Sequence, residues 1–386
     1  MRTRIVAASV LALACALSSV PVSAHALETF GSQSKKIIVF QDGVSQNDAA
    51  KILDQVPGTV ADRKELDSGK ATAGIVTDET ARQLAKAPGV ARVEDDIELV
   101  TQGRLDRKQK VSWGFDAVQA RAAWPVSREG QAIRVGIIDT GIDMDHPDLL
   151  AVLKGGVNEI DSQKSWDDDG GHGTHVAGIV AAQNNHIGTL GVAPNVKLYG
   201  IKALNRRGIG YLSDIIQGID WAIAHHLDVL NMSLGTSADI PSLHEAINRA
   251  LAAHVTVVAA AGNSGGSVLY PAAYDGVIAV GMVDHRLRVN RHSSGGTGLD
   301  VVAPGVRILS TYKRGRYRVY TGTSMATPYV TGAVALLLAT PNSCNHGCAP
   351  STVERLVRNS ATDLLSPGWD VRSGSGLVNI NALVSQ

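Results

Sequence analysis

The sequence predicts an α/β fold: a large domain built on a mostly parallel sheet with helices on both faces, preceded by a smaller α/β unit. Through most of the chain, short apolar runs alternate with segments of helical spacing, which is typical of parallel strands buried on both faces. The charge balance also changes, because residues 27–102 carry 9 basic and 13 acidic side chains and residues 103–386 carry 25 and 23. We therefore expect two units.

The first unit, residues 27–102, is predicted to contain three strands and two helices. The strands are expected at 36–40, 73–76 and 90–93, and the helices at 46–56 and 80–86. The run 103–110 is polar and charged with no apolar period, so it is predicted to be an exposed linker and processing region.

The second unit, residues 111–386, alternates between the two kinds of pattern. Continuous apolar runs predict strands, and amphipathic spacing between them predicts helices. The strands are expected at 133–138, 196–201, 227–232, 255–261 and 277–280, and the helices at 172–182, 212–225, 243–253, 325–339 and 351–360.

The N-terminus is predicted to be a signal peptide covering residues 1–26. Arg2 and Arg4 precede an apolar stretch at 5–20, and small residues surround an A-x-A site at 23–26. A membrane anchor is the alternative, which the shortness of the apolar stretch disfavours. No other apolar run is long enough to span a bilayer, and a formal net charge of zero argues against a nucleic-acid-binding protein. We expect an exported protein, extracellular or periplasmic.

Removal of the signal peptide leaves two cysteines, Cys344 and Cys348, in the sequence CNHGC. In an oxidising compartment they are predicted to form a small disulfide loop. Metal binding together with His346 is the alternative, but these neighbouring residues supply at most three ligands.

Four polar residues lie at the ends of apolar elements, in positions suited to catalysis. Asp139 ends an apolar strand, where open α/β sheets place their active sites, although a turn or helix cap would also explain it. His172 begins a helix; a single His is more often structural, and acid–base work requires a nucleophile and an orienting carboxylate nearby. Ser324 precedes an apolar helix, as a nucleophile or as an N-cap. Asn263 follows a strand, as an oxyanion donor or as a turn residue.

Together these segments occur in the order Asp, His, Ser, and they resemble those of the subtilisin (subtilase) family of secreted serine endopeptidases. The matching stretches are IIDTGID (137–143), HGTHVAG (172–178), NMSLG (231–235), AGN (261–263) and GTSMATP (322–328). The resemblance implies a three-layer subtilisin-like domain, and residues 36–99 are similar to the family's inhibitory prodomain, a small ferredoxin-like α+β fold. It implies Asp139, His172 and Ser324 as the catalytic triad. Asn263 and the Ser324 backbone N–H would form the oxyanion hole.

The resemblance also implies where a peptide substrate binds. Two extended segments are similar to those that sandwich a substrate as an added strand, although their glycines would also suit turns. These segments are Gly208, Ile209 and Gly210, and Ser233, Leu234 and Gly235.

Residues near these segments bear on specificity. Ser264 would lie at the rim of the S1 pocket, so we expect no preference for Lys or Arg at P1. Leu269 stands where the family often has Gly at the pocket base. Arg206 and Arg207 are expected to be a solvated pair, with a contact to acidic P2 or P4 residues as the alternative hypothesis.

Structural calcium is the cofactor that the resemblance implies. Six oxygen donors fall where the family's calcium site draws its ligands, and oxygen ligands suit Ca²⁺. They are the side chains of Gln109, Asp148 and Asn185 and the carbonyls of Gln183, Ile187 and Thr189. The triplet Asp167, Asp168 and Asp169 is expected to be an exposed acidic turn, with a weaker ion site as the alternative.

Two other classes of function fit less well. An α/β-hydrolase esterase requires G-x-S-x-G and the order Ser, Asp, His, whereas the motif here ends in Ala326. A non-catalytic binding protein would not need all four catalytic residue types. We expect a monomeric endopeptidase that acts on polypeptides, has its own prodomain as inhibitor, and matures by autoprocessing between about residues 100 and 109. Nucleic-acid partners and stable membrane insertion are not expected.

Overall fold

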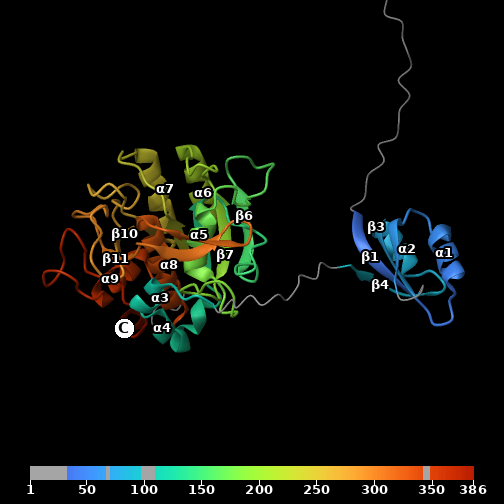
Figure 1. The fold of residues 1–386 in the computed structure, drawn as a ribbon. Coiled ribbons are helices and arrows are strands. Elements are labelled where there is room, and N and C mark those ends of the chain that lie inside the picture. The colour runs from blue at the N-terminus through green and yellow to red at the C-terminus, as the bar shows by residue number, and fades with distance from the viewer. Residues whose placement is uncertain (1–32, 67–69, 97–108, 342–347) are drawn as a thin grey trace, which may run out of the picture. The chain divides into compact units, whose positions relative to one another are not determined.

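The computed structural model describes residues 33–66, 70–96, 109–341 and 348–386. The predicted signal peptide and most of the predicted linker lie outside these residues. The chain divides into two compact units, residues 1–104 and 105–386, whose elements are drawn in Figure 1. Within the described parts of the chain, none of the helices has the length and apolar character needed to cross a membrane.

The first unit is a four-stranded antiparallel sheet with two helices, in the βαββαβ order of a ferredoxin-like fold. The strand order is β2-β3-β1-β4, so the charged β2 lies at an edge. Sequence patterning missed β2 because its residues are almost all exposed and show no apolar alternation. The elements are β1 (Gln33–Phe40), α1 (Gln46–Gln55), β2 (Ala61–Leu66), β3 (Ala71–Thr77), α2 (Asp78–Leu84) and β4 (Val90–Asp95).

The second unit is built on a seven-stranded sheet in the order β11-β10-β9-β8-β5-β7-β6, and every neighbouring pair is parallel. This confirms the predicted mostly parallel sheet. Its strands are β5 (Arg134–Asp139), β6 (Leu153–Asn158), β7 (Lys197–Lys202), β8 (Val229–Met232), β9 (Thr256–Ala260), β10 (Ile278–Val283) and β11 (Val301–Pro304). A separate antiparallel hairpin consists of β12 (Ile308–Tyr312) and β13 (Arg316–Tyr320).

Helices cover both faces of this sheet, which makes three layers (Figure 1). In β5 the side chain of Ile137 belongs to the core beneath α5 and α8, whereas that of Ile138 belongs to the core beneath α6 and α7. The main helices are α5 (His172–Ala181), α6 (Leu212–Ala224), α7 (Pro241–Ala252), α8 (Thr323–Ala339) and α9 (Pro350–Ser360). Shorter ones are α3 (Trp113–Ala117), α4 (Ala120–Ser127), the 3₁₀ turn Arg128–Gly130 and α10 (Ile380–Val384).

The strand order reverses at β5, which lies between β7 and β8. In open α/β sheets, ligands bind outside the carboxyl ends of the strands at such a switch point. Asp139 ends β5 and Ser233 follows β8, so both lie at this edge of the sheet. Patterning missed β6, β11, the hairpin and the short helices, all of which have short or interrupted apolar runs.

Candidate active site

Asp139 and His172 form a hydrogen-bonded pair at the carboxyl end of β5. Asp139 is the last residue of β5 and is fully buried, and His172 is the first residue of α5. Both carboxylate oxygens of Asp139 lie 2.8 Å from Nδ1 of His172. Because Nδ1 faces the carboxylate, Nε2 is the ring nitrogen left to exchange a proton.

The electrostatic surroundings favour a charged imidazole at His172. Burial lowers the pKa of His172, but the charge and hydrogen bond of Asp139, with the charge of Asp168, outweigh burial and raise this pKa above 6.5. The side chain is 31% exposed, so a ligand can reach it. His175 differs, because burial lowers its pKa to about 4 and its Nε2 lies 3.0 Å from the carbonyl of Arg318. His175 is a neutral structural residue.

Ser324 is the second residue of α8 and lies against the segment that follows β8. Its hydroxyl donates to the carbonyl oxygen of Ser233 at 3.1 Å, and the Ser233 hydroxyl donates to the Ser324 carbonyl at 2.9 Å. Among the described residues, the Ser324 hydroxyl has no hydrogen bond to His172. Catalytic hydrogen bonds of this kind are often long without substrate and tighten in the complex.

The Asn263 side chain is oriented by the residue before Ser324. The backbone N–H and hydroxyl of Thr323 both donate to Oδ1 of Asn263, at 2.8 and 3.2 Å. Because the N–H of Thr323 needs an acceptor, this assigns the oxygen and leaves Nδ2 as a donor. As a first-turn residue of α8, Ser324 also has a backbone N–H without an intrahelical partner. Asn263 Nδ2 and the Ser324 N–H are thus two donors without a partner in their own element.

Asn231 and Thr331 support this arrangement from behind. Asn231 Nδ2 donates to the Ser233 hydroxyl at 3.0 Å, and the Thr331 hydroxyl donates to Asn231 Oδ1 at 2.8 Å. Asn231 and Thr331 are fully buried, in β8 and α8. Asn231 begins the matching stretch NMSLG, and Thr331 is a polar side chain within an apolar helix, but neither signal revealed the shared network.

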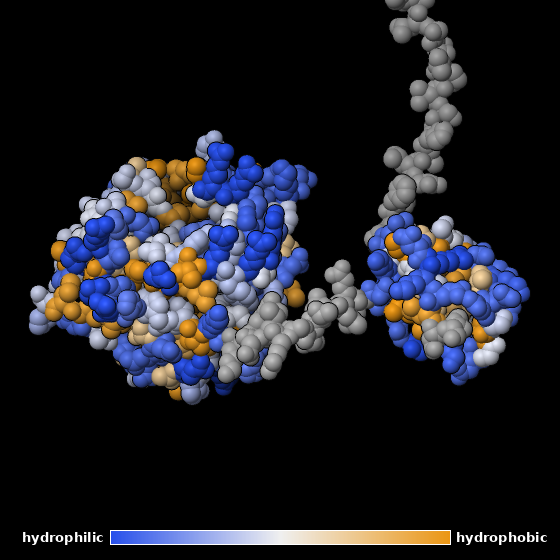
Figure 2. Space-filling model, in the orientation of Figure 1, coloured by the Kyte–Doolittle hydropathy of each residue, from blue (hydrophilic) through white to orange (hydrophobic). Residues whose placement is uncertain are grey.

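A cavity of about 700 Å³ adjoins His172 and runs between the two segments expected to bind substrate. All six predicted residues line it, from Gly208 to Gly210 and from Ser233 to Gly235. A Cβ at Gly210 would lie 2.1 Å from the carbonyl oxygen of Ala203, so the close approach there requires glycine. Figure 2 shows hydrophobic surface between α6 and α7, and the apolar side chains that line this cavity include Leu212 and Leu243.

Among the residues that the structure describes, the Lys, Arg, Asp and Glu side chains that line this cavity are those of Arg206 and Arg207. Both are exposed, and the described carboxylates form no ion pair with either of them. A turn fixes their backbone, since Asn205 Oδ1 accepts from the N–H of Arg207 at 2.9 Å and the Gly208 N–H donates to the Asn205 carbonyl at 2.8 Å.

Leu269 fills the space between two segments that flank Ser324. A Cβ placed at Gly262 would lie 2.8 Å from Leu269 Cγ, and one at Gly235 would lie 3.1 Å from Leu269 Cβ. The backbone of Leu269 is fixed, because its N–H donates to the carbonyl of Ala261 at 2.9 Å. Leu269 therefore packs closely against both Gly235 and Gly262.

The six oxygen donors expected to hold calcium lie close together. Gln109 Nε2 donates to the carbonyls of Gln183 and Thr189, at 2.6 and 2.8 Å. Asp148 Oδ2 accepts from the N–H of Thr189 at 2.9 Å, and its buried Oδ1 has no partner among the described residues. Asn185 Oδ1 accepts from the N–H of Ile187 at 3.1 Å.

The donor chemistry of this group fits a hard cation. Burial raises the pKa of Asp148, although hydrogen bonds from Thr189 and Asn185 oppose the effect, and an unpartnered buried carboxylate oxygen is a ready ligand. Within the described residues there is no cluster of three or more His, Cys, Asp or Glu side chains suited to a metal. The group instead consists of one carboxylate with amide and carbonyl oxygens.

The expectation of an exposed acidic turn is wrong for one of the three aspartates. Asp167 and Asp169 are exposed, but Asp168 is only 4% exposed. Its partners come from β5 and α5, so patterning along the sequence could not identify it. Cys348 takes part in a disulfide, whereas Cys344 lies outside the described residues, so their pairing remains a prediction.

Comparisons with known proteins agree with this arrangement. The model of the subtilase family matches residues 130–376. The chain is 38% identical over 386 residues to an alkaline protease of Alkalihalobacillus alcalophilus, covering 98% of each chain. It is 38% identical over 370 residues to subtilisin E of Bacillus subtilis, covering 94% of this chain and 93% of that protein. It is 43% identical over 296 residues to alkaline elastase YaB of a Bacillus strain, covering 76% and 74%. The chain therefore belongs to the subtilase family and is a serine endopeptidase.

Proposed function

We propose that this endopeptidase cleaves polypeptides through an acyl-enzyme formed on Ser324. The Ser324 Oγ attacks the scissile carbonyl carbon while Nε2 of His172 accepts the hydroxyl proton. His172 then gives this proton to the leaving amine as the C–N bond breaks. Water attacks the ester in the second half of the reaction, with His172 again as the base, and the proton returns to Ser324. Asp139 orients the imidazole and stabilises its charged form.

Asn263 and the Ser324 backbone N–H are proposed to stabilise the oxyanion. Charge develops on the carbonyl oxygen as the tetrahedral intermediate forms, and donors fixed in advance stabilise it without reorganisation. The two hydrogen bonds from Thr323 hold the Asn263 amide in place, which supports this role.

The substrate is proposed to bind as an extended strand between the two segments that line the cavity. Backbone hydrogen bonds would supply sequence-independent affinity, and the apolar cavity would receive alternate side chains. The single observation that carries the proposal is the joint position of the Asp139–His172 pair, Ser324 and Asn263 at one edge of the sheet.

We also infer that the chain is made as a secreted zymogen. Residues 1–26 would direct export, and residues 27–102 would fold as a prodomain that inhibits the protease until cleavage in the region up to Gln109. The ferredoxin-like fold of the first unit supports this role. The mature enzyme is proposed to act as a monomer on polypeptides.

Calcium is proposed as a structural ligand. Asp148 and the side chains of Gln109 and Asn185 would hold it, together with the carbonyls of Gln183, Ile187 and Thr189. It would tie the segment at Gln109 to the loop after α5, and so contribute stability rather than chemistry.

The experiment that tests this function is the intact mass of the exported protein beside a Ser324→Ala variant. We expect the wild type to lose roughly its first hundred residues, and the variant to keep everything after the signal peptide. Ser351→Ala, which removes an exposed hydroxyl near the start of α9, is the matched control and should mature normally.

A second measurement separates loss of catalysis from loss of folding. A fluorophosphonate probe should label wild type and Ser351→Ala once per chain, with the adduct at Ser324, and should not label Ser324→Ala. If Ser324→Ala matures like the wild type, self-processing through Ser324 is wrong. If wild type carries no adduct at Ser324, its role as nucleophile is wrong.

A further inference from the structure

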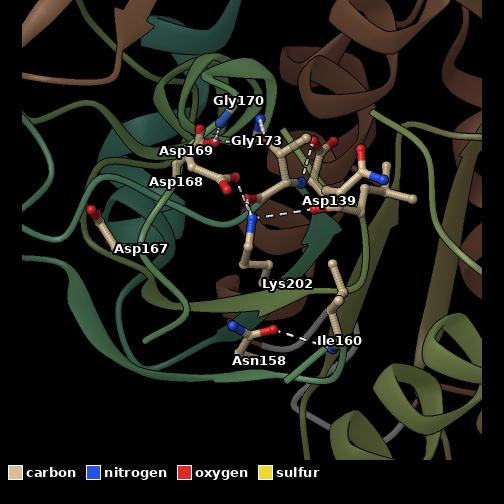
Figure 3. Close-up of polar contacts among 12 residues, drawn as sticks. Asp139, Asn158, Ile160, Asp167, Asp168, Asp169, Gly170, Gly173 and Lys202 are labelled. Atoms are coloured by element: carbon tan, nitrogen blue, oxygen red, sulfur yellow. Dashed lines mark hydrogen bonds and ion pairs between the residues drawn. The ribbon is translucent and has the colours of Figure 1, made fainter. Parts of the chain in front are cut away.

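Asp168 lies in the loop between β6 and α5 and is almost completely buried. Its carboxylate accepts five hydrogen bonds, from only four residues. Oδ1 accepts from the Thr140 hydroxyl at 2.8 Å and from the N–H groups of Gly170 and Gly171 at 2.8 and 2.7 Å. Oδ2 accepts from the N–H and hydroxyl of Thr174 at 2.9 and 2.6 Å. Figure 3 shows Asp168 among the polar contacts of this region, with Asp169, Gly170, Gly173 and Asp139 also labelled.

These partners belong to the two elements that carry the catalytic pair. Thr140 directly follows Asp139 at the end of β5, and Gly171 directly precedes His172 at the start of α5. The Thr140 hydroxyl also accepts from the N–H of Gly173 at 3.0 Å. One carboxylate therefore fastens the end of β5 to the first turn of α5, on both sides of the Asp139–His172 contact.

Close packing makes this junction sensitive to small displacements. A Cβ at Gly173 would lie 2.1 Å from the carbonyl oxygen of Gly141 and 3.0 Å from Cβ of Asp139. Lys202, which is labelled in Figure 3, also holds Thr140, because its Nζ donates to the Thr140 carbonyl at 2.6 Å. A shift of α5 relative to β5 would change the Asp139–His172 geometry directly.

The charge of Asp168 is stabilised by neutral donors. Among the described residues it has no ion pair with Lys, Arg or His, and Lys202 pairs with Asp169 instead. The N–H groups at the start of α5 supply the positive end of the helix dipole. The charges that favour the protonated His172 imidazole are those of Asp139, which contacts it, and Asp168, and His175 one turn along α5 also interacts with it electrostatically.

We propose that Asp168 is a positioning residue for the catalytic pair, which holds His172 at its distance from Asp139 by fastening α5 to β5. This inference rests on the proposed triad. It separates two contributions: the hydrogen bonds through Thr140 and Thr174 set the geometry, and the charge acts on His172 through space.

The first test is kcat and KM of mature Asp168→Asn, expressed per active site by fluorophosphonate titration. The amide keeps one oxygen acceptor but cannot accept on its other side, so both bonds from Thr174 are lost. We expect kcat to fall between about 10- and 100-fold, the effect of a small misplacement of a catalytic group, with KM within about twofold. The acid limb of kcat/KM should move to lower pH, because a negative charge that favours protonated His172 is gone.

Asp167→Asn is the matched control, since it removes the same charge from the preceding, exposed residue, whose Oδ1 accepts from the N–H of Met144. It should leave kcat and the acid limb unchanged. Thr140→Val provides a second variant that keeps the Asp168 charge: it should lower kcat without moving the acid limb.

A purely structural role would lower the Tm and the titratable fraction of Asp168→Asn while kcat per site and the acid limb stay at wild-type values, and that result would overturn the proposal. If Asp168→Asn does not fold, an unchanged kcat in Thr140→Val overturns it instead. If wild-type enzyme is not labelled at Ser324, the proposed triad has failed, which is a distinguishable outcome.

Discussion

Asp300 is expected to destabilise the second unit, residues 105–386, above neutral pH. It lies just before β11, is buried, and accepts a hydrogen bond at Oδ2 from the N–H of Ala279 at 2.8 Å. Arg358 is the nearest cation, with Nη1 3.8 Å from Oδ1, and Glu354 adds a repelling charge. Burial is the largest influence and raises the pKa of Asp300 from 3.8 to about 7.

The sign and size of the effect follow from this shift. The folded state binds the Asp300 proton more tightly than the unfolded state does. The contribution of protonated Asp300 to the free energy of unfolding is therefore complete below about pH 4. It is lost as pH rises through about 7, and levels off above that. A difference of about three pKa units corresponds to about 4 kcal/mol of unfolding free energy.

Asp300→Asn removes the charge and can keep an oxygen acceptor for Ala279. We expect the free energy of unfolding to match the parent near pH 4 and to exceed it by up to about 4 kcal/mol at pH 9. Both proteins should carry Ser324→Ala to prevent autolysis. Urea unfolding can be followed by tryptophan fluorescence, because all five tryptophans lie between residues 105 and 386.

Asp284→Asn is the control of opposite sign. Burial raises the pKa of Asp284, but hydrogen bonds from Arg288 and the backbone outweigh it, so the pKa is lowered. Its removal should destabilise the protein at neutral pH, and this loss should vanish as pH falls below 3.8. If the Asp300→Asn difference is the same at pH 4 and pH 9, the carboxylate is fully compensated in the fold and the reasoning is wrong.

Four further predictions concern the site. Asn263→Leu should lower kcat by about 10²–10³, the range known for the side-chain oxyanion donor of subtilisin, with little change in KM; a larger change in KM than in kcat would contradict this. Leu269→Gly should deepen the pocket and raise the kcat/KM ratio of P1 Phe over P1 Ala substrates by about tenfold or more. Peptides with Glu at P2 and P4 can be compared with peptides that have Ala there. Replacing Arg206 and Arg207 by Gln should lower the ratio of kcat/KM for Glu peptides to that for Ala peptides by up to about fivefold per charge. Equal kcat/KM for the two peptides in the parent enzyme would reject the acidic-substrate hypothesis. A calcium chelator should lower the Tm of the Ser324→Ala protein. Adding Asp148→Asn to this protein should lower its Tm in the presence of calcium, and the chelator should then lower the Tm less than it does without the substitution. A Tm that the chelator leaves unchanged would argue against the calcium site.

The elements that patterning identified are those with strong local signals. The strands β5, β7, β8, β9 and β10 are largely apolar runs; α6, α7 and α9 have clear apolar spacing, whereas α5 and α8 are apolar almost all round. The charged edge strand β2 and the glycine-rich β6 carry no such signal, because their pairing depends on neighbours distant in the chain. The active site likewise combines residues with a local sequence signal and contacts between segments distant in the chain.

By itself, the sequence determined the fold class and the residues expected to react. Asp139, His172, Asn263 and Ser324 each lie at the end of an element, within a motif only a few residues long. The tertiary structure decided how these residues are held. Three aspartates follow one another at 167–169, and only Asp168 is buried, because its hydrogen-bond donors come from Thr140, directly after β5, and from residues at the start of α5. Burial and hydrogen bonding depend on which distant segments meet, and that is fixed only when the sheet and helices pack.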